Sequence, residues 1–189
     1  MDTRVDTIVD VCRALAADAP DTATSRLTHS YPFTAPVATP RRYGPIEATN
    51  VFVRDGFVDR YTGSRVVFPP VLRAISALLP VDFPYHPNWK MDSTHPAYWE
   101  LTATLDHLVP ASRGGGDDAS NWVTTSMARN SAKGNWTLED LGWVLQPPGS
   151  ISEWDGLLAW YVDITTAHPE TLLDNSMNQW RAAALKVLT

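Results

Sequence analysis

The segment 102–134 constrains the fold of this chain more than any other. Within 102–109 the residues alternate between two faces, which is the period-two pattern of a strand. Pro110 cannot donate a sheet hydrogen bond, so it ends this strand. The glycine-rich run 113–118 supplies a turn, and 121–125 reads as a second strand antiparallel to the first. A helix is predicted to follow directly, so the unit is strand, loop, strand, helix.

Polar side chains in this unit suit the hydrolysis of a phosphodiester bond. Asp106 and His107 close the first strand. Asn130 and Lys133 lie about one turn apart on the helix and share a face. Histidine suits a base near neutral pH, and carboxylate and amide oxygens suit Mg²⁺ or Mn²⁺. The reaction needs a base to deprotonate water and a cation to stabilise the developing charge.

The strand pattern is difficult to reconcile with a site in which Asp106 and His107 act on the same ion. Adjacent strand residues point to opposite faces, so Asp106 and His107 cannot both face one ion from a regular strand. Either a kink redirects one of them, or they reach around the end of the strand. Taken singly, Asn130 reads as a helix cap, Asn121 as a turn residue and Lys133 as a solvated charge. Only their ordered combination favours a nuclease site.

In this order the residues resemble the HNH nuclease family, whose active site lies on a ββα-metal fold. The matching positions are Asp106, His107, Pro110, Gly114, Gly115, Gly116, Asn121, Asn130 and Lys133. A weaker resemblance runs from about Gly56 to Trp143. The resemblance implies an α+β fold with a ββα-metal core, and we predict an additional hairpin before this core and helices flanking it.

The resemblance implies a role for each polar position. His107 would be the general base, and Asp106 and Asn130 would hold one Mg²⁺ or Mn²⁺ ion. Asn121 would pin the loop and help to orient His107. Lys133 would bind a neighbouring phosphate.

Zinc-binding relatives in this family carry two Cys-x-x-Cys pairs. The corresponding positions here are Asp59, Thr62, Ser126 and Arg129. Because none of these can form a tetrathiolate site, no structural zinc is expected. Something else must then tie the segment 51–61, which resembles a hairpin, to the active-site unit: an Asp59–Arg129 ion pair, or apolar packing by Tyr61, Val66 and Phe68. We favour packing, because exposed ion pairs contribute only about 0–1 kcal/mol.

The formal net charge of −6 counts against a nucleic-acid binder, but the charge is uneven. Residues 41–136 carry ten basic against nine acidic groups, whereas 137–189 carry two against seven. The middle of the chain could therefore present a basic face. Arg113, Arg41 and Arg42 are weaker candidates for contacts with DNA phosphates.

The N-terminal third predicts one helix followed by irregular chain. Residues 3–17 are amphipathic, which indicates packing on the body of the protein, with a dimer contact as the alternative. Five prolines within 19–50 predict a segment that wraps the surface. Residues 51–61 resemble a hairpin that turns at Asp55-Gly56.

Prolines and helix-capping residues predict where the remaining helices begin. Pro69-Pro70 predicts a helix to Leu79, and Thr137 opens a capping box. Ser152 is predicted to cap a later helix, and Pro169 to lie in the first turn of the last one.

His86 and His95 lie in an aromatic stretch and could be proposed as a second metal pair. No cysteine or close carboxylate accompanies them. We therefore favour aromatic packing for both histidines.

These patterns together predict a metal-dependent DNA endonuclease. The regions are 1–50, an N-terminal helix and wrapping segment; 51–145, the nuclease core; and 146–189, an acidic helical hairpin. No run of apolar residues predicts a membrane span, no signal peptide is recognisable, and the single Cys12 fits a cytoplasmic protein. The alternative is an inactive module of the same fold that binds DNA or, through its terminal helices, a protein partner or a second copy.

Overall fold

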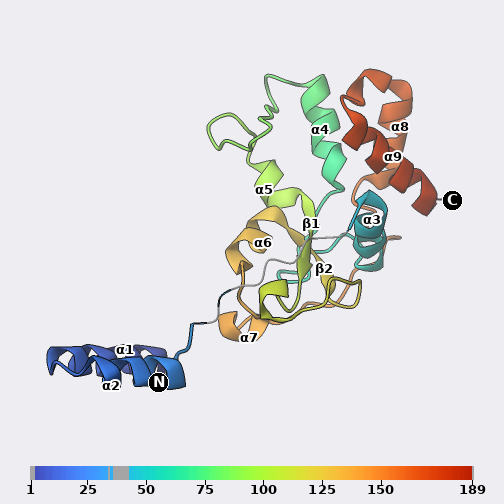
Figure 1. Cartoon of the computed structure of the whole chain (residues 1–189). Coiled ribbons are helices and arrows are strands. Elements are labelled where there is room, and N and C mark those ends of the chain that lie inside the picture. Colours follow the sequence, from blue (N-terminus) through green and yellow to red (C-terminus); the bar gives the residue numbers. More distant parts are fainter. Residues whose placement is uncertain (1–2, 34, 36–42, 189) are drawn as a thin grey trace. The chain divides into compact units, whose positions relative to one another are not determined.

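The computed structural model describes residues 3–33, 35 and 43–188. The chain divides into two compact units, Met1–Val37 and Ala38–Thr189 (Figure 1). In the described part of the chain, helices accompany one small antiparallel sheet of two strands, so the α+β class is confirmed. None of the described helices is long and apolar enough to cross a membrane.

The first unit is a pair of helices, α1 (Thr3–Ala16) and α2 (Pro20–Ser30), that pack along each other (Figure 1). The helix predicted for residues 3–17 is confirmed. The irregular segment predicted for 19–50 is wrong over much of its length. Pro20 begins α2, because the first position of a helix needs no N–H donor.

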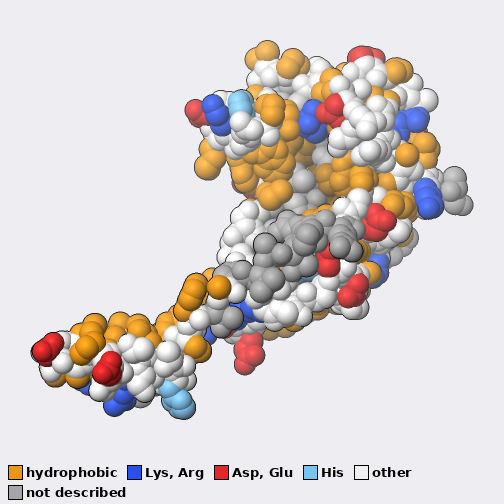
Figure 2. Space-filling view, in the orientation of Figure 1, with side chains coloured by type: hydrophobic (Ala, Val, Ile, Leu, Met, Phe, Trp, Pro, Cys, Tyr) orange, Lys and Arg blue, Asp and Glu red, His pale blue; other side chains and the backbone are white. Residues whose placement is uncertain are grey.

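The apolar face of α1 is only partly covered within this unit. Val5, Ile8 and Leu15 remain exposed, and Figure 2 shows hydrophobic side chains along the two-helix unit. The two roles predicted for this face, packing on the body or a dimer contact, stay predictions.

The second unit holds the sheet and the other helices. In chain order its elements are α3 (Pro45–Arg54), α4 (Pro69–Leu78), α5 (Ala97–Leu101), β1 (Ala103–His107), η1 (Ala111–Arg113), β2 (Trp122–Ser126), α6 (Met127–Lys133), α7 (Leu138–Leu141), α8 (Leu158–Ala167), η2 (Pro169–Thr171) and α9 (Asn175–Leu188). The helix predicted after Pro69 and the capping box predicted at Thr137 are both confirmed.

The hairpin predicted for residues 51–61 is wrong. Residues 51–54 are the last turn of α3, which has Pro45 at its first position. Three apolar side chains of this helix are buried: Ala48, Val51 and Phe52. Burial of one helical face outweighs the strand propensity of this apolar run. An isolated antiparallel bridge pairs Val58 with Arg65, so the chain turns back within 59–64 and not at Asp55-Gly56.

The C-terminal helices share one core with α3 and the sheet. Phe68 packs edge-on against Tyr161 of α8 and Trp180 of α9, with ring centroids 5.6 and 5.4 Å apart. Trp180 also stacks on Phe52 of α3 at 6.4 Å. Residues 146–189, predicted as a region of their own, therefore belong to the same compact unit as the sheet.

The last two helices begin later than predicted. Leu157, with a φ of 64°, precedes the first residue of α8, so Ser152 does not cap this helix. Pro169 lies in the separate turn η2. The cap of α9 is Asp174, whose carboxylate accepts a hydrogen bond from the Met177 N–H at 2.9 Å.

The outer edge of β2 is hydrogen-bonded by side chains. The Asp55 carboxylate accepts the Thr124 N–H at 2.8 Å. The Asp59 carboxylate accepts the Ser126 N–H at 2.9 Å. Arg54 donates to the carbonyl of the first residue of β2 at 2.6 Å. Buried backbone groups on a strand edge need such partners, and here the segment after α3 supplies them.

These carboxylates tie the segment that follows α3 to the unit formed by β1, β2 and α6. The Asp59–Arg129 ion pair is wrong, because Asp59 accepts backbone hydrogen bonds and the Arg129 guanidinium lies over the Trp143 ring at 5.6 Å. Val66 and Phe68 are buried in the core, so the predicted packing is present. The sequence did not predict the other part of this connection, the hydrogen bonds from the Asp55 and Asp59 carboxylates to β2.

Removal of the Asp55 carboxylate tests this connection. The side chain is fully buried and pairs with Arg54 at 3.0 Å and Arg60 at 2.9 Å. Asp55→Ala should lower the free energy of unfolding by about 3–5 kcal/mol in urea denaturation, because it leaves two guanidinium groups and a backbone N–H without their acceptor. Asp163→Ala, on an exposed face of α8, is the control and should leave the midpoint unchanged. If Asp55→Ala and Asp163→Ala unfolded at the same urea concentration, the Asp55 carboxylate would not stabilise the edge of β2.

Candidate active site

The strand, loop, strand and helix predicted for residues 102–134 are present as β1, the loop with η1, β2 and α6. The strands are antiparallel, with Asp106 opposite Val123 and His107 opposite Trp122. The local unit is therefore confirmed, although β1 is shorter than predicted.

Asn121 joins the two ends of the loop. Its side chain accepts a hydrogen bond from the Val109 N–H and donates to the Val109 carbonyl, both at 2.9 Å, and it donates to the Gly116 carbonyl at 2.8 Å. Glycine is required at position 115, where the loop passes close to the Val109 backbone, since a Cβ there would lie 1.8 Å from the Val109 oxygen. Asn121 fixes the loop that follows His107 through Val109 and Gly116, and these hydrogen bonds do not involve the imidazole.

The Asp106 carboxylate is buried, and one of its oxygens has two partners. Oδ2 accepts the Tyr61 hydroxyl at 2.6 Å and lies 3.0 Å from Lys133 Nζ. Burial, followed by the negative charge of Asp106, raises the pKa of Tyr61 far above its ordinary value. The Tyr61 hydroxyl therefore stays protonated and acts as a donor to Asp106.

Lys133 is not placed to bind a phosphate. The whole residue is buried, and Nζ donates to the His107 carbonyl at 2.7 Å as well as pairing with Asp106. The predicted phosphate contact stays a prediction that this burial does not favour, because the ammonium does not reach the surface. Lys133 instead joins the end of β1 to α6.

The His107 imidazole points toward the loop and β2. Its Nε2 lies 2.9 Å from Asp117 Oδ1 and 3.1 Å from the indole Nε1 of Trp122. The indole N–H is also 3.2 Å from the same Asp117 oxygen. In the tautomer that carries a proton on Nε2, His107 donates to Asp117 and keeps Nδ1 as its lone pair.

Asp106 and Asn130 meet at one pocket. Its volume is about 380 Å³, and both residues line it together with Thr104, Met127 and Ser131. Asn130 Nδ2 donates to the Leu105 carbonyl at 2.9 Å and to Thr104 Oγ1 at 3.2 Å, so its amide plane is fixed.

His107 lies outside this group. It is not one of the residues that line the pocket, and its partners differ from those of Asp106. β1 is regular through both residues, so their side chains leave opposite faces. The structure therefore brings together the two predicted metal ligands and leaves the predicted base on the other face of the strand.

The two ligands have free oxygens. No donor from the described residues contacts Oδ1 of Asp106 or Oδ1 of Asn130. Two protein oxygens beside an open pocket fit Mg²⁺, which usually keeps several waters. Among the described residues no group of three or more His, Cys, Asp or Glu side chains could hold a metal, so an all-protein cage is not available there. The Lys133 ammonium beside Asp106 would share its carboxylate with any bound cation.

The other predicted site residues lie elsewhere. Arg113 pairs with Asp140 and lies over the Trp136 ring at 5.5 Å, so its guanidinium is already engaged. Arg41 and Arg42 fall outside the described residues. His95 stacks on Phe83 with ring centroids 4.1 Å apart, which agrees with the predicted aromatic packing.

Three contacts of the site were not foreseen from the sequence. Tyr61 was assigned only to packing, Asp117 only to a turn and Trp122 only to a strand. Asp117 has no sequence signal that separates it from a turn residue. The position of Trp122 opposite His107 follows from the register alone and could have been found.

Comparison of the chain with protein-family models, curated proteins and solved structures found no match.

Lys133→Met tests whether this lysine is internal. The variant leaves the buried Asp106 carboxylate without its charged partner, so the free energy of unfolding should fall by about 3 kcal/mol in urea denaturation. Lys90→Met is the matched control on an exposed lysine and should leave the unfolding midpoint unchanged. A fall no larger than that of the control would mean that Lys133 is solvated, as a phosphate-binding lysine would be.

Proposed function

We propose that this chain is a divalent-metal-dependent endonuclease that hydrolyses DNA phosphodiester bonds. The observation that carries the proposal is the open pocket where the Asp106 carboxylate and the Asn130 amide meet, each with a free oxygen. The ordered motif, which resembles that of the HNH family, supports the same reaction. One Mg²⁺ or Mn²⁺ ion bound by these oxygens would supply the positive charge that stabilises the phosphorane and the leaving oxygen.

His107 would be the general base that deprotonates the attacking water. Its Nε2 faces Asp117, which holds the imidazole in one orientation and leaves Nδ1 to accept a proton from water. Asp117 acts on the reaction through His107 and is a positioning residue. Because His107 and Asp106 leave opposite faces of β1, the scissile phosphate would sit at the end of this strand, where groups on both faces can reach it.

Tyr61 and Lys133 support the ligand carboxylate. Both contact Asp106 Oδ2, so Oδ1 is left to face the pocket. Lys133 also holds the His107 carbonyl, which links the backbone of the base to the carboxylate of the ligand. The even charge of residues 41–136 fits modest DNA affinity that falls with salt.

The alternative function is that of a catalytically inactive module, in which the residues of the motif only stabilise the fold. One observation favours this alternative. The Asp106 carboxylate already has Lys133 and Tyr61 as partners, so it is satisfied without a metal. Such a module would bind DNA or a protein without cleaving anything.

His107→Ala separates the two functions. If the protein is an endonuclease, cleavage of supercoiled plasmid in Mg²⁺ should fall at least about 100-fold, because general-base catalysis contributes that much, while DNA binding in a gel-shift assay persists. His168→Ala changes an exposed histidine beside α8 and should retain full cleavage.

The metal ligands provide an independent check. Asp106→Asn and Asn130→Ala should each raise the Mg²⁺ concentration needed for half-maximal cleavage, and a chelator should abolish nicking by the unmodified chain. Absence of metal-dependent nicking in the unmodified protein would favour the inactive module. Cleavage unchanged by Asp106→Asn would overturn the ligand assignment.

A further inference from the structure

Helix α1 leaves a stripe of apolar side chains partly exposed. This α1 stripe consists of Val5, Ile8, Val9, Cys12 and Leu15, which share one face of the helix. Val5 and Leu15 are 56% and 55% exposed, and Cys12 between them is also exposed. A contiguous apolar face rimmed by polar residues is typical of a surface that binds another protein.

The other helix of the unit packs on a different face of α1. The residues of α1 that are buried or half-buried are Thr7, Asp10, Val11 and Ala14, which recur every three or four positions. Arg26 of α2 pairs with Asp10 at 3.2 Å, so α2 lies on this face. At 3.6 residues per turn this face is largely opposite the α1 stripe. The more apolar side of α1 is therefore the side that α2 does not cover.

The core of the two-helix unit is small. Among its described residues only Val11 and Ala23 are buried. Units shorter than about 40 residues usually need a disulfide, a metal or oligomerisation to keep their fold. Cys12 is a free cysteine, so no disulfide joins the two helices. A second apolar surface on the α1 stripe would supply the burial that the unit lacks by itself.

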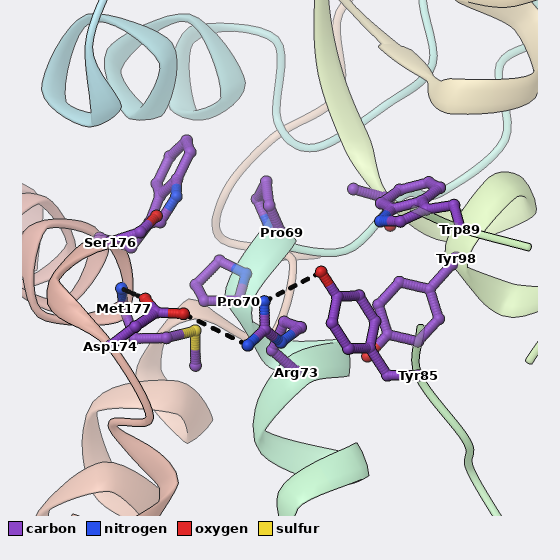
Figure 3. Close-up of a pocket in the computed structure, with 11 residues that line it drawn as sticks. Pro69, Pro70, Arg73, Tyr85, Trp89, Tyr98, Asp174, Ser176 and Met177 are labelled. Atoms are coloured by element: carbon purple, nitrogen blue, oxygen red, sulfur yellow. Dashed lines mark hydrogen bonds and ion pairs between the residues drawn. The ribbon is translucent and has the colours of Figure 1, made fainter. Parts of the chain in front are cut away.

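The groups that line a pocket of the second unit, by contrast, have partners within the chain. Figure 3 shows the Arg73 guanidinium between Asp174, before α9, and Tyr85 of the loop before α5. Arg73 pairs with Asp174 at 3.3 Å and donates to the Tyr85 hydroxyl at 3.1 Å. The charges there are already matched, whereas the aliphatic side chains of the α1 stripe are only partly covered.

The α1 stripe has the spacing of a seam between two helices. Val5, Ile8, Cys12 and Leu15 are three, four and three positions apart, which are the a and d positions of two heptads. Val9 lies beside this seam, and none of the five residues is charged. Such a seam packs against a second helix with the same spacing. Two copies of α1 meet that requirement with one and the same surface.

Charges at the two ends of the α1 stripe favour antiparallel pairing of two copies. Arg4 precedes Val5 at one end, and Asp18 follows the last turn of α1 at the other. When Val5 of one copy lies beside Leu15 of the other, Arg4 of each copy comes near Asp18 of the other. Antiparallel helices also place opposite ends of their dipoles together. Parallel pairing would instead bring like charges and like helix ends together.

We propose that α1 is a self-association helix, through which two copies of this chain pair antiparallel along their α1 stripes. Each α1 is then covered by its own α2 on one side and by the α1 of the other copy on the opposite side. The seam is only two heptads long, so the dimer dissociates on dilution. The contact needs neither the metal nor His107, so it stands independently of the proposed nuclease.

Sedimentation equilibrium of the full chain tests the pairing, in a reducing buffer that prevents cross-links through Cys12. The mass should rise from one chain to two as the concentration approaches about 1 mM. Leu15→Lys should weaken the dimer at least about 100-fold, because it sets an ammonium against Val5 of the other copy. Leu79→Lys is the matched control: this leucine of the second unit is 52% exposed, and the variant should dimerise like the unmodified chain.

Reversal of the end charges tests the identity and the direction of the partner. Arg4→Glu and Asp18→Lys should each weaken self-association about tenfold, because each variant places like charges together at both ends of the seam. An equal mixture of the two variants should regain the affinity of the unmodified chain, since both ends then pair opposite charges. His107→Ala should dimerise normally, which separates this result from the fate of the nuclease proposal.

Three results would each overturn the proposal. The first is the mass of a single chain at every concentration, which would assign the α1 stripe to the body of the same chain or to a different protein. The second is a dimer that Leu15→Lys does not weaken. The third is a mixture of Arg4→Glu and Asp18→Lys that associates no more tightly than either variant alone.

Discussion

The structure depends on how the outer edge of β2 is satisfied. A sheet of two strands has two open edges, and buried N–H and C=O groups there must find partners. Asp55 and Asp59 accept the N–H groups of Thr124 and Ser126, and Arg54 covers a carbonyl of the same strand. Buried side chains of the segment that follows α3 thus hold the edge of the sheet.

That connection determines the surroundings of the candidate site. The segment held by Asp59 brings Tyr61 to the Asp106 carboxylate, and α6 brings Lys133 to the same oxygen. Asp106 is thereby held through one oxygen, and it lines an open pocket together with Asn130. His107 is held separately, by Asp117, whose carboxylate also accepts the indole N–H of Trp122. The two halves of the proposed chemistry are thus supported by different contacts on the two faces of one short strand.

Local patterns were enough to predict the unit of strand, loop, strand and helix, because alternation, a closing proline and a glycine-rich turn act over short distances. They left open whether a kink redirects Asp106 or His107, and the structure shows a regular strand through both residues. The helical state of residues 51–54 and the burial of Lys133 follow from contacts with distant elements, which override local propensity and expose or hide a charge. The partners Tyr61 and Asp117 likewise depend on contacts that no local pattern encodes.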